Sequence, residues 1–569
     1  MLPPGDKPGG KQSCQKEPEM NVDSPADYIV VGAGSAGCVI ANHLSADPNI
    51  RVTLLEAGSR DSSPWIHIPV GYFKTMHNPD FDWCFETQPD PGIGGRSLHW
   101  PRGKVLGGSS SLNGLLYVRG QREDYDLWAQ KGNAGWSWTD VGPIFEELET
   151  FQRGAGEGRG TRGPLQVSDP RLKRRICELW IEAAKARGHS YNPDYNGSVQ
   201  EGVGHFQLTV DRGRRCSASR AFLHPVRSRH NLHVVPKAQV SRVVIDAGRA
   251  TGVEIMRPDG SRQVLRAERE VILAAGAIGS PHILMLSGVG DADALRQHGI
   301  NVACDLPDVG RNLQDHLQAR LVFKTLEATL NDEVRSLFNK ARIGLEYALR
   351  RTGPMAMAAS LVFGFMKTRP DLATPDIQFH IQPWSADSPG EGVHPFSAFT
   401  QSVCQLRPES RGTITLAAAD PGQAPLIQPN YLSAQLDCDT IVAGVEMARQ
   451  FARTEPLRSA ISEEFRPLPD VQGYDETLAW ARENSTTIYH PTGTCRMGAD
   501  EASVVDPRLR VRGIRGLRVA DCSIMPDIVS GNTNAPAMMI GAKLARMIFE
   551  DRRAETSWPA ARGAFSQVA

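Results

Sequence analysis

The sequence predicts an α/β fold, α+β overall, whose first domain is built on a βαβ unit and is discontinuous in the chain. The first observation is an apolar run rich in β-branched residues at 28–31, which is typical of a buried strand. A glycine-rich turn at 32–37, a helical pattern and a second apolar run at 52–55 follow it directly. The second observation is a late strand at 517–521 followed by a helix at 535–549, which indicates that the C-terminus rejoins the first domain. With 569 residues, the chain has room for two or more packed regions.

The glycine-rich turn has the Gly-x-Gly-x-x-Gly spacing of a dinucleotide-binding site. Gly32 permits the tight turn, Gly34 lets the backbone approach a pyrophosphate, and Gly37 lets the helix pack closely on the strand. The free N–H groups at the start of the helix favour the anionic pyrophosphate. Glu56 lies 22 residues after Gly34, where its carboxylate can accept hydrogen bonds from a ribose diol. A purely structural glycine turn is the alternative, but both strands and the acid are in place, so the pattern predicts a Rossmann-like dinucleotide site.

Composition and charge exclude several classes of protein. The formal net charge of −1 gives no electrostatic reason to expect nucleic-acid binding. The 10 cysteines form no CxxC pair, so neither a metal site nor a disulfide framework is indicated, and a reducing cytoplasm is expected. Residues 1–25 are rich in Pro, Gly and Lys and lack the apolar stretch of a secretory signal, so we expect a disordered extension, with Met20 as an alternative start. The longest apolar run, at 355–366, is too short to span a bilayer.

Two further segments have more than one interpretation. Gly107 and Gly108 precede three serines, and such a segment is either a cradle for an anion or polar cofactor or a solvent loop. Residues 333–351 are predicted to form a helix with basic residues beside an apolar stripe. The stripe consists of Val334, Leu337, Phe338, Ala341, Leu345 and Ala348. Such a stripe more often faces the protein's own core, whereas a basic amphipathic helix can also lie on a membrane.

Two segments near the C-terminus carry the side chains best suited to catalysis. Pro491 restricts His490 to an extended backbone, and an imidazole is the usual proton acceptor near neutral pH. A lone histidine is more often structural, but this one precedes a glycine-rich turn. Asn532 and Asn534 stand at the entrance of a helix, where they can cap it or can hydrogen-bond a substrate oxygen or the edge of a ring. The spacing leaves that choice open.

The order of these motifs resembles the glucose–methanol–choline family of flavin-dependent oxidoreductases over nearly the whole chain. Four blocks carry the resemblance: residues 32–56, residues 103–113, residues 276–290, and His490 with Asn534. Within the family, residues 95–120 are most similar to the bacterial aliphatic alcohol dehydrogenases, and next to the choline dehydrogenases.

The resemblance implies FAD as cofactor and a division into two domains. The FAD-binding domain would comprise residues 26–155, 206–318 and 484–552. A substrate domain with an antiparallel sheet covered by helices would comprise residues 156–205 and 319–483. Residues 553–569 would form a C-terminal tail.

The resemblance also implies which residues meet the FAD. The serine-rich block would lie along the flavin and pyrophosphate, Asp521 and Asn532 would meet the ribityl and pyrophosphate parts, and Val240 would contact adenine through its main chain. The expected FAD-binding residues are Gly32, Gly34, Ser35, Gly37, Glu56, Ala57, Arg102, Gly107, Gly108, Ser109, Asn113, Val240, Ala275, Gly276, Tyr489, Asp521, Asn532 and Thr533. Members with covalent flavin carry a histidine where this chain has Trp100, with His99 one place off, so the FAD is expected to be non-covalent.

By the same resemblance, His490 is the catalytic histidine, and Asn534 occupies a second position that holds His or Asn. His490 would accept the alcohol proton while the α-hydride passes to flavin N5, which gives an aldehyde. Asn534 would orient the alcohol oxygen and stabilise its developing charge. The sequence has one fingerprint of this kind and FAD occupies it, so a quinone, another electron carrier or oxygen is expected as acceptor.

We expect the substrate to be an uncharged primary alcohol with an apolar tail. Residues 65–73 and 356–365, which should lie near the cavity, are apolar and offer no carboxylate to a quaternary ammonium, although Glu333 or Glu346 could supply one. The alternatives are a choline dehydrogenase, an oxygen-using alcohol oxidase, and a non-redox lyase or photoenzyme on the same fold. A cytoplasmic protein is expected, with peripheral contact to the inner membrane through residues 333–351 and 355–366.

Overall fold

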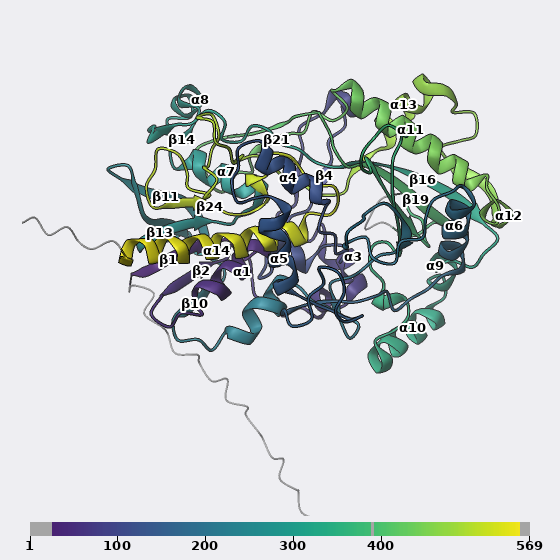
Figure 1. Ribbon diagram of the computed structural model, residues 1–569, viewed down its shortest axis with the longest axis horizontal. Helices are drawn as coiled ribbons and strands as arrows, with labels where there is room; N and C mark the ends of the chain where they lie inside the picture. The colour runs from purple at the N-terminus through teal and green to yellow at the C-terminus, as the bar shows by residue number, and fades with distance from the viewer. Residues whose placement is uncertain (1–24, 388–391, 558–569) are drawn as a thin grey trace, which may run out of the picture.

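The computed structural model describes residues 25–387 and 392–557, and it consists of two regions with different kinds of sheet (Figure 1). The expectations for residues 1–24, including the start at Met20, and for most of the tail lie outside the described residues.

The first region is built around a seven-stranded sheet. Its strands, in order across the sheet, are β10 (Leu232–Val235), β2 (Val52–Leu55), β1 (Ala26–Val31), β13 (Arg262–Leu273), β12 (Arg249–Met256) and β11 (Gln239–Asp246), and β24 (Leu517–Val519) also pairs with β13. The pairs from β10 to β13 and the pair β13–β24 are parallel, whereas β11, β12 and the start of β13 form an antiparallel meander. The pairing of β24 with β13 confirms that the C-terminus rejoins the first domain.

Helices from both ends of the chain pack together on this sheet. Helix α1 (Ser35–Leu44) follows β1 and packs against α14 (Asn534–Ser557), so that purple and yellow segments lie side by side in Figure 1. A Cβ on Gly541 of α14 would lie 2.6 Å from the Ala36 carbonyl oxygen, so only glycine allows this approach. Helix α5 (Trp138–Leu148) packs on α14, and α7 (Gly276–Leu286) follows β13 and packs on β11.

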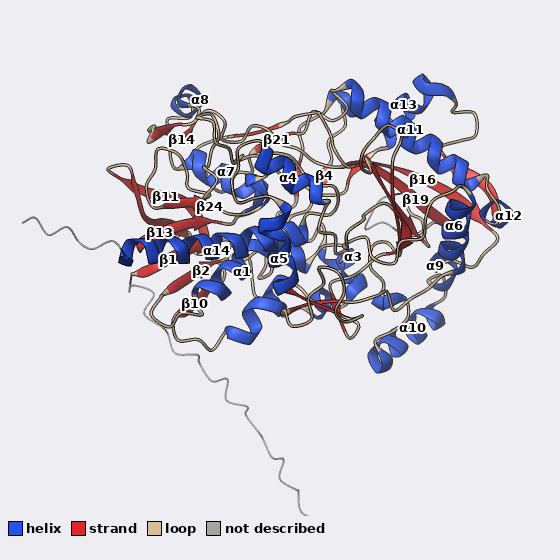
Figure 2. Ribbon diagram, in the orientation of Figure 1, coloured by secondary structure: helices blue, strands red, loops and turns tan. Residues whose placement is uncertain are grey.

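The second region is built around an antiparallel sheet. Its strands, in order, are β22 (Ile461–Arg466), β16 (Leu317–Thr325), β19 (Ala398–Gln405), β18 (Ile377–Gln382), β17 (Val362–Met366) and β7 (Gly202–His205), and β23 (Thr486–Thr487) also pairs with β16. Helices α6 (Arg175–Ala186), α11 (Gln435–Ala452) and α13 (Gly473–Asn484) pack against it (Figure 2). The expected fold class is therefore confirmed, including an antiparallel sheet covered by helices, while the domain boundaries stay a prediction.

The remaining elements are two-stranded pairs and further α-helices. The two-stranded pairs are β3 (Phe85–Glu86) with β4 (His99–Trp100), β5 (Glu149–Phe151) with β6 (Leu165–Val167), β8 (Val210–Asp211) with β9 (Arg214–Arg215), β14 (Val289–Gly290) with β15 (Cys304–Asp305), and β20 (Thr413–Thr415) with β21 (Leu426–Gln428). The remaining α-helices are α2 (Pro64–His67), α3 (Tyr72–Thr75), α4 (Arg122–Gln130), α8 (Ala292–Gln297), α9 (Leu330–Glu333), α10 (Leu337–Arg350) and α12 (Leu457–Ala460).

Two expectations about apolar segments are wrong. The run at 355–366 ends in β17, all of whose residues are buried within the second sheet, so this segment does not reach a membrane. The helix expected at 333–351 is broken between α9 and α10, and its predicted stripe does not face the core. Leu337, Phe338 and Leu345 are 82%, 77% and 60% exposed, whereas Ile343 and Tyr347 on another side of α10 are buried. No helix in the described part of the chain is long and apolar enough to cross a bilayer.

Candidate functional site

A cavity of about 560 Å³ lies between the two regions. One wall consists of the ends of β1 and β2, the start of α1 and the serine-rich turn, and the opposite wall consists of β16 and β18 of the antiparallel sheet. All but two of the expected cofactor residues line it. The exceptions are Gly37 and Gly107.

The glycine fingerprint has the geometry of a ligand cradle. A Cβ on Gly37 would lie 1.9 Å from the Gly32 carbonyl oxygen, so Gly37 is required for the packing of helix on strand. A Cβ on Gly34 would meet only the Ala274 carbonyl oxygen, at 3.9 Å, and would otherwise project into the cavity. The first turn of α1 leaves its N–H groups without intrahelical partners at this point. Backbone donors and open space therefore coincide where a pyrophosphate would bind.

The serine-rich segment is part of the same cradle. Residues Gly108–Ser111 form a 3-10 turn that is largely buried, and a Cβ on Gly108 would lie 2.6 Å from the Gly34 Cα. Gly107, at φ +90°, begins the turn, and Ser109 Oγ accepts a hydrogen bond from the Gly103 N–H. The solvent-loop interpretation is therefore excluded, and the two glycine-rich segments form one continuous surface.

Two buried carboxylates mark the ends of the cradle. Glu56, at the end of β2, accepts hydrogen bonds from the N–H groups of Ala33 at 3.0 Å and Gly58 at 2.8 Å. Burial raises the pKa of Glu56 to about 7. Asp521, at the end of β24, accepts from the Gly276 N–H at 2.8 Å and the Ser280 hydroxyl at 2.6 Å. Each carboxylate retains acceptor capacity toward the cavity, and the residues present therefore fit a bound dinucleotide.

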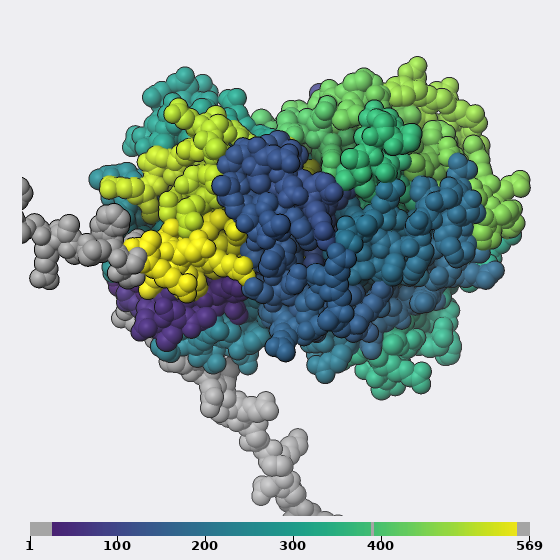
Figure 3. Space-filling model, viewed as in Figure 1, coloured from purple at the N-terminus to yellow at the C-terminus, as the bar shows by residue number. Residues whose placement is uncertain are grey.

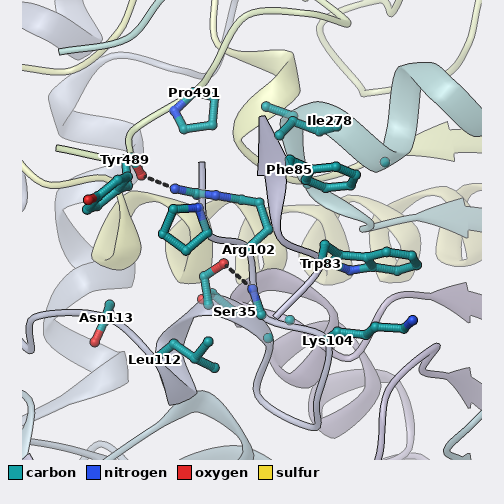
Figure 4. Close-up of a pocket in the computed structure, with 18 of the residues that line it drawn as sticks. Ser35, Trp83, Phe85, Arg102, Lys104, Leu112, Asn113, Ile278, Tyr489 and Pro491 are labelled. Carbon is teal, nitrogen blue, oxygen red and sulfur yellow. Dashed lines mark hydrogen bonds between the residues drawn. The ribbon is translucent and has the colours of Figure 1, made fainter. Parts of the chain in front are cut away.

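Arg102 ties the cradle to the segment that carries His490. Its Nη2 donates to the Tyr489 carbonyl at 2.5 Å, a contact drawn as the dashed line beside the Tyr489 label in Figure 4. The backbone of Tyr489 has φ +69°, a conformation that residues other than glycine rarely adopt. An unfavourable backbone conformation of this kind persists only where surrounding contacts keep it in place, and it is common at functional sites.

His490 is the end of a hydrogen-bonded chain that fixes its tautomer. His316 lies immediately before β16, and its Nε2 is 3.0 Å from the Leu406 carbonyl, which can only accept. His316 Nε2 therefore carries a proton, and in the neutral ring its Nδ1 is an acceptor. His316 Nδ1 is 3.0 Å from His490 Nδ1, which must then be the donor. The remaining nitrogen, His490 Nε2, is left with a lone pair.

The backbone of His490 is held as firmly as its ring. Its N–H donates to Asp315 Oδ1 at 2.6 Å, and Asp315 Oδ2 accepts from Thr487 and Tyr431 hydroxyls. Burial, with smaller contributions from His316, Arg102 and His380, holds the pKa of His490 well below its usual range. The ring is therefore neutral at pH 7 and is able to accept a proton.

The structure exchanges the expected positions of the two asparagines. Asn532 Nδ2 lies 3.2 Å from His490 Nε2, and Asn532 Oδ1 accepts from Gln378 Nε2 at 3.4 Å. Asn534 Oδ1 instead accepts from the Ser35 hydroxyl at 2.8 Å. The reason is that α14 begins at Asn534, which turns this side chain back toward α1, whereas Asn532 precedes the helix and faces the sheet. The pairing of His490 with Asn534 expected from the sequence is thus corrected to a pairing with Asn532.

The polar side chains of the opposite wall were not predicted from the sequence. The segments expected to make it apolar contribute mainly Tyr72, Phe73, Ala359 and Ser360. The strands contribute polar side chains at alternate positions, namely Gln318 and Arg320 of β16 and His380 and Gln382 of β18. Alternation along a strand is visible in the sequence, but the polar residues of such a pattern are normally the solvent-facing ones. Within the residues that the structure describes, no group of three or more metal-ligating side chains is placed to hold an ion.

Comparison with known proteins agrees with this geometry. Models of the GMC oxidoreductase family match residues 26–318 and 408–541. The chain is 43% identical over 525 residues to an alcohol dehydrogenase (acceptor) of Pseudomonas putida, which covers 92% of this chain and 95% of the relative. It is 41% identical over 530 residues to the mitochondrial choline dehydrogenase of Mus musculus, and the match covers 92% of this chain and 89% of that protein. The crystal structure of pyridoxine 4-oxidase from Mesorbium loti matches with a TM-score of 0.84 at 29% identity and covers 92% of this chain and 99% of that one.

Proposed function

The chain belongs to the GMC oxidoreductase family, and from this premise we propose that it is an FAD-dependent dehydrogenase that oxidises primary aliphatic alcohols to aldehydes. The family implies FAD and action on the CH–OH group of a donor. The observation that carries the proposal is the lone pair of His490 Nε2, which faces the amide of Asn532 in a buried cavity next to the dinucleotide cradle.

The side chains around His490 can perform the proton chemistry. His490 Nε2 accepts the hydroxyl proton of the alcohol, and His316 keeps that nitrogen unprotonated beforehand. Asn532 Nδ2 donates to the alcohol oxygen and stabilises the negative charge that develops on it. Bound FAD supplies the acceptor for the α-hydride. The fingerprint glycines, Glu56 and Asp521 would hold it.

We propose that the FAD is not covalently attached. Trp100 is fully buried in the core and does not line the cavity, and the ring of His99 lies at the surface, 5.4 Å from that of His77. No histidine of this segment therefore faces the cradle. Acid precipitation should release the yellow cofactor into the supernatant. Flavin that stays with the protein pellet would contradict this.

The cavity argues against choline as substrate, although relatives named choline dehydrogenases are 41% identical. The carboxylates that line it, Glu56 and Asp521, are both engaged with backbone N–H groups in the cradle. Glu333 pairs with Arg174 and Glu346 accepts from Thr352, and neither lines the cavity. A quaternary ammonium would thus lack a counter-charge at the substrate end.

For the electron acceptor we propose a quinone or another non-nicotinamide carrier. The support is that the sequence holds one dinucleotide fingerprint, together with the acceptor-linked naming of the Pseudomonas putida relative. An oxygen-using oxidase is the second candidate, because an oxidase has the same fold.

One experiment tests both parts of the proposal. Primary alcohols should bleach the flavin absorbance under anaerobic conditions, and a quinone analogue should restore it faster than air does. A flavin that no alcohol reduces would refute the dehydrogenase. Faster reoxidation by oxygen would favour the oxidase.

A further inference from the structure

The substrate end of the cavity contains a buried guanidinium without a counter-charge. Arg320 lines the cavity from β16 and is 9% exposed. Its one hydrogen bond in the described structure runs from Nη1 to the Asp387 carbonyl at 3.5 Å, the outer limit for such a contact. No carboxylate among the described residues lies within ion-pair distance of it. Burial lowers the pKa of Arg320 from its ordinary value.

Other buried arginines of this chain show what ordinary pairing looks like. Arg119 and Arg159 share Glu149 at 2.8 and 2.7 Å, and Arg518 pairs with Glu270 at 2.8 Å. Arg215, which has no carboxylate partner, donates instead to three oxygen acceptors at 2.7 to 3.2 Å. Burying an ion without such partners costs several kcal/mol. Arg320 carries that cost on the wall of a cavity, where a bound anion can offset it.

The carboxylate of the neighbouring Asp387 is paired with Arg466 and His394, and the other groups around Arg320 are hydrogen-bond donors rather than acids. The hydroxyl of Tyr72 and the indole N–H of Trp384, both in the cavity wall, are buried without a partner. Ser402 lies opposite Arg320 in the β16–β19 register, and its hydroxyl is also without a partner. Burial raises the pKa of Tyr72, so its hydroxyl keeps its proton. A planar guanidinium fork with neighbouring hydroxyl donors suits a carboxylate.

Strand β16 also sets the distance between this group and the reacting end. His316, which contacts His490, immediately precedes β16, and Arg320 lies four residues further along. At about 3.3 Å per residue this separates their Cα atoms by roughly 13 Å. Phe73 and Trp384, in edge-to-face contact at 5.3 Å, give the cavity an apolar surface for a hydrocarbon stem.

We propose that Arg320 binds the carboxylate of the alcohol substrate, so that the enzyme prefers ω-hydroxy carboxylates to neutral alcohols of the same length. The inference rests on the proposed function, because it places the reacting hydroxyl at His490. It also replaces the uncharged substrate expected from the sequence with an anionic one.

The test compares medium-chain ω-hydroxy acids with terminal diols of matched length, by kcat/KM and by anaerobic flavin reduction. The native enzyme should prefer the acids. Arg320→Gln should lose at least ~30-fold on the acids, because truncating one partner of a buried charge pair costs about 2–5 kcal/mol. It should change by only a few fold on the diols, and Arg320→Lys should recover part of the loss. Arg458→Gln, which removes an exposed charge on α12, is the matched control and should behave as native.

A second measurement does not depend on turnover. Calorimetric titration with octanoate, an unreactive carboxylate, should show binding to the native holoenzyme and to the Arg458→Gln control but not to Arg320→Gln. Diol turnover by the same variant shows that it is folded. Equal preference of the native enzyme for acids and diols, or octanoate binding that survives Arg320→Gln, would overturn the proposal. If neither series reduces the flavin but octanoate binding still depends on Arg320, the proposed function fails while the anion site stands.

Discussion

The two walls of the cavity satisfy their polar groups in opposite ways. In the wall built from the first region, Glu56 accepts hydrogen bonds from two donors of the protein itself and Asp521 from three. In the wall built from the antiparallel sheet, Arg320, His380 and Gln382 keep polar atoms that are buried with few or no partners. The acids of the first wall have their hydrogen bonds before any ligand binds, whereas these side chains of the second wall do not.

The difference indicates what each wall recognises. A wall of glycine backbone and internally satisfied acids fixes one shape, which suits a cofactor that every catalytic cycle reuses. A wall with unsatisfied side chains gains its hydrogen bonds from the substrate, and unpaired buried groups discriminate strongly against molecules that lack the matching group. His490 and Asn532 lie where the walls meet, and variants there should have the largest effects.

His490→Ala should keep its FAD and lose alcohol-dependent flavin reduction by about 10² to 10⁴-fold or more, because the general base is removed. His394→Ala is the matched control, since His394 is equally buried but bonds Ser385 outside the cavity. Stopped-flow reduction under anaerobic conditions measures the rate. A native rate in the His490 variant would show that the proton acceptor lies elsewhere.

The two asparagines distinguish the junction from the cofactor wall. Asn532→Ala should slow flavin reduction by about 10² to 10³-fold, the usual effect of removing one donor to a developing oxyanion. Asn534→Ala should instead weaken FAD retention and leave the reduction rate within several fold, because its side chain bonds Ser35. Ser35→Ala should resemble Asn534→Ala. If Asn534→Ala reduces its flavin more slowly than Asn532→Ala while FAD stays fully bound, then Asn534 is the partner of His490, as expected from the sequence alone.

The same contrast explains what the sequence could predict. The cradle is encoded locally, because Gly32, Gly34 and Gly37 act through spacing along one turn, and its position at the ends of β1 and β2 was predicted. The roles of Asn532 and Asn534 depend on where α14 begins, which spacing does not specify. The partnership of His316 with His490 joins residues 174 positions apart and has no local signal.

The sheet wall was missed for a related reason. Gln318 and Arg320 alternate with apolar residues, which is also the pattern of a strand with one face in water. Only the packing of the two regions against each other reveals that this polar face is buried.

His316 offers a pH-dependent test of the junction. His316→Leu should lose about 10 to 100-fold in kcat/KM, as is typical when a partner that orients a reacting side chain is removed. His316→Gln should recover part of the activity, because its amide can both accept from His490 and donate to Leu406. Burial is the largest cause of the lowered pKa of His490, and His316 is the second. On the acid side of the pH profile, native kcat/KM should therefore fall only at a pH below the usual histidine pKa range. His490 must be neutral to act, so removing His316 should move this fall to higher pH. An unshifted fall in the leucine variant would refute the coupling.

The smallest effect is expected at the outer surface of the sheet region, in helix α10. It protrudes at the lower right in Figure 1 and forms the teal edge of the surface in Figure 3. Leu337 and Phe338 are 82% and 77% exposed, and the exposed Lys340 and Arg342 lie beside them. We propose that this face lies on an anionic membrane, where apolar burial and about 1 kcal/mol per basic residue add together.

The helix also has a route to the cavity. After α10 the chain forms a 3-10 turn, Pro354–Ala356, which packs on the turn Pro69–Gly71 that precedes Tyr72. Ala359 then lines the cavity itself. A membrane under α10 would therefore place a lipid-soluble acceptor near the wall that receives the substrate.

Co-sedimentation with vesicles that contain phosphatidylglycerol tests this last proposal. The double variant Leu337→Ser with Phe338→Ser should lower the bound fraction by at least ~10-fold in partition coefficient, because each side chain contributes about 1.5–3 kcal/mol when fully buried. Leu468→Ser, an exposed leucine 57% accessible on another part of the sheet region, should bind as the native protein does. Raising the salt concentration should weaken binding of native protein, since the basic residues act through screened charge. Native protein that fails to sediment at any salt concentration would leave α10 as an exposed helix without a lipid partner. The acceptor would then have to reach the cavity from solution.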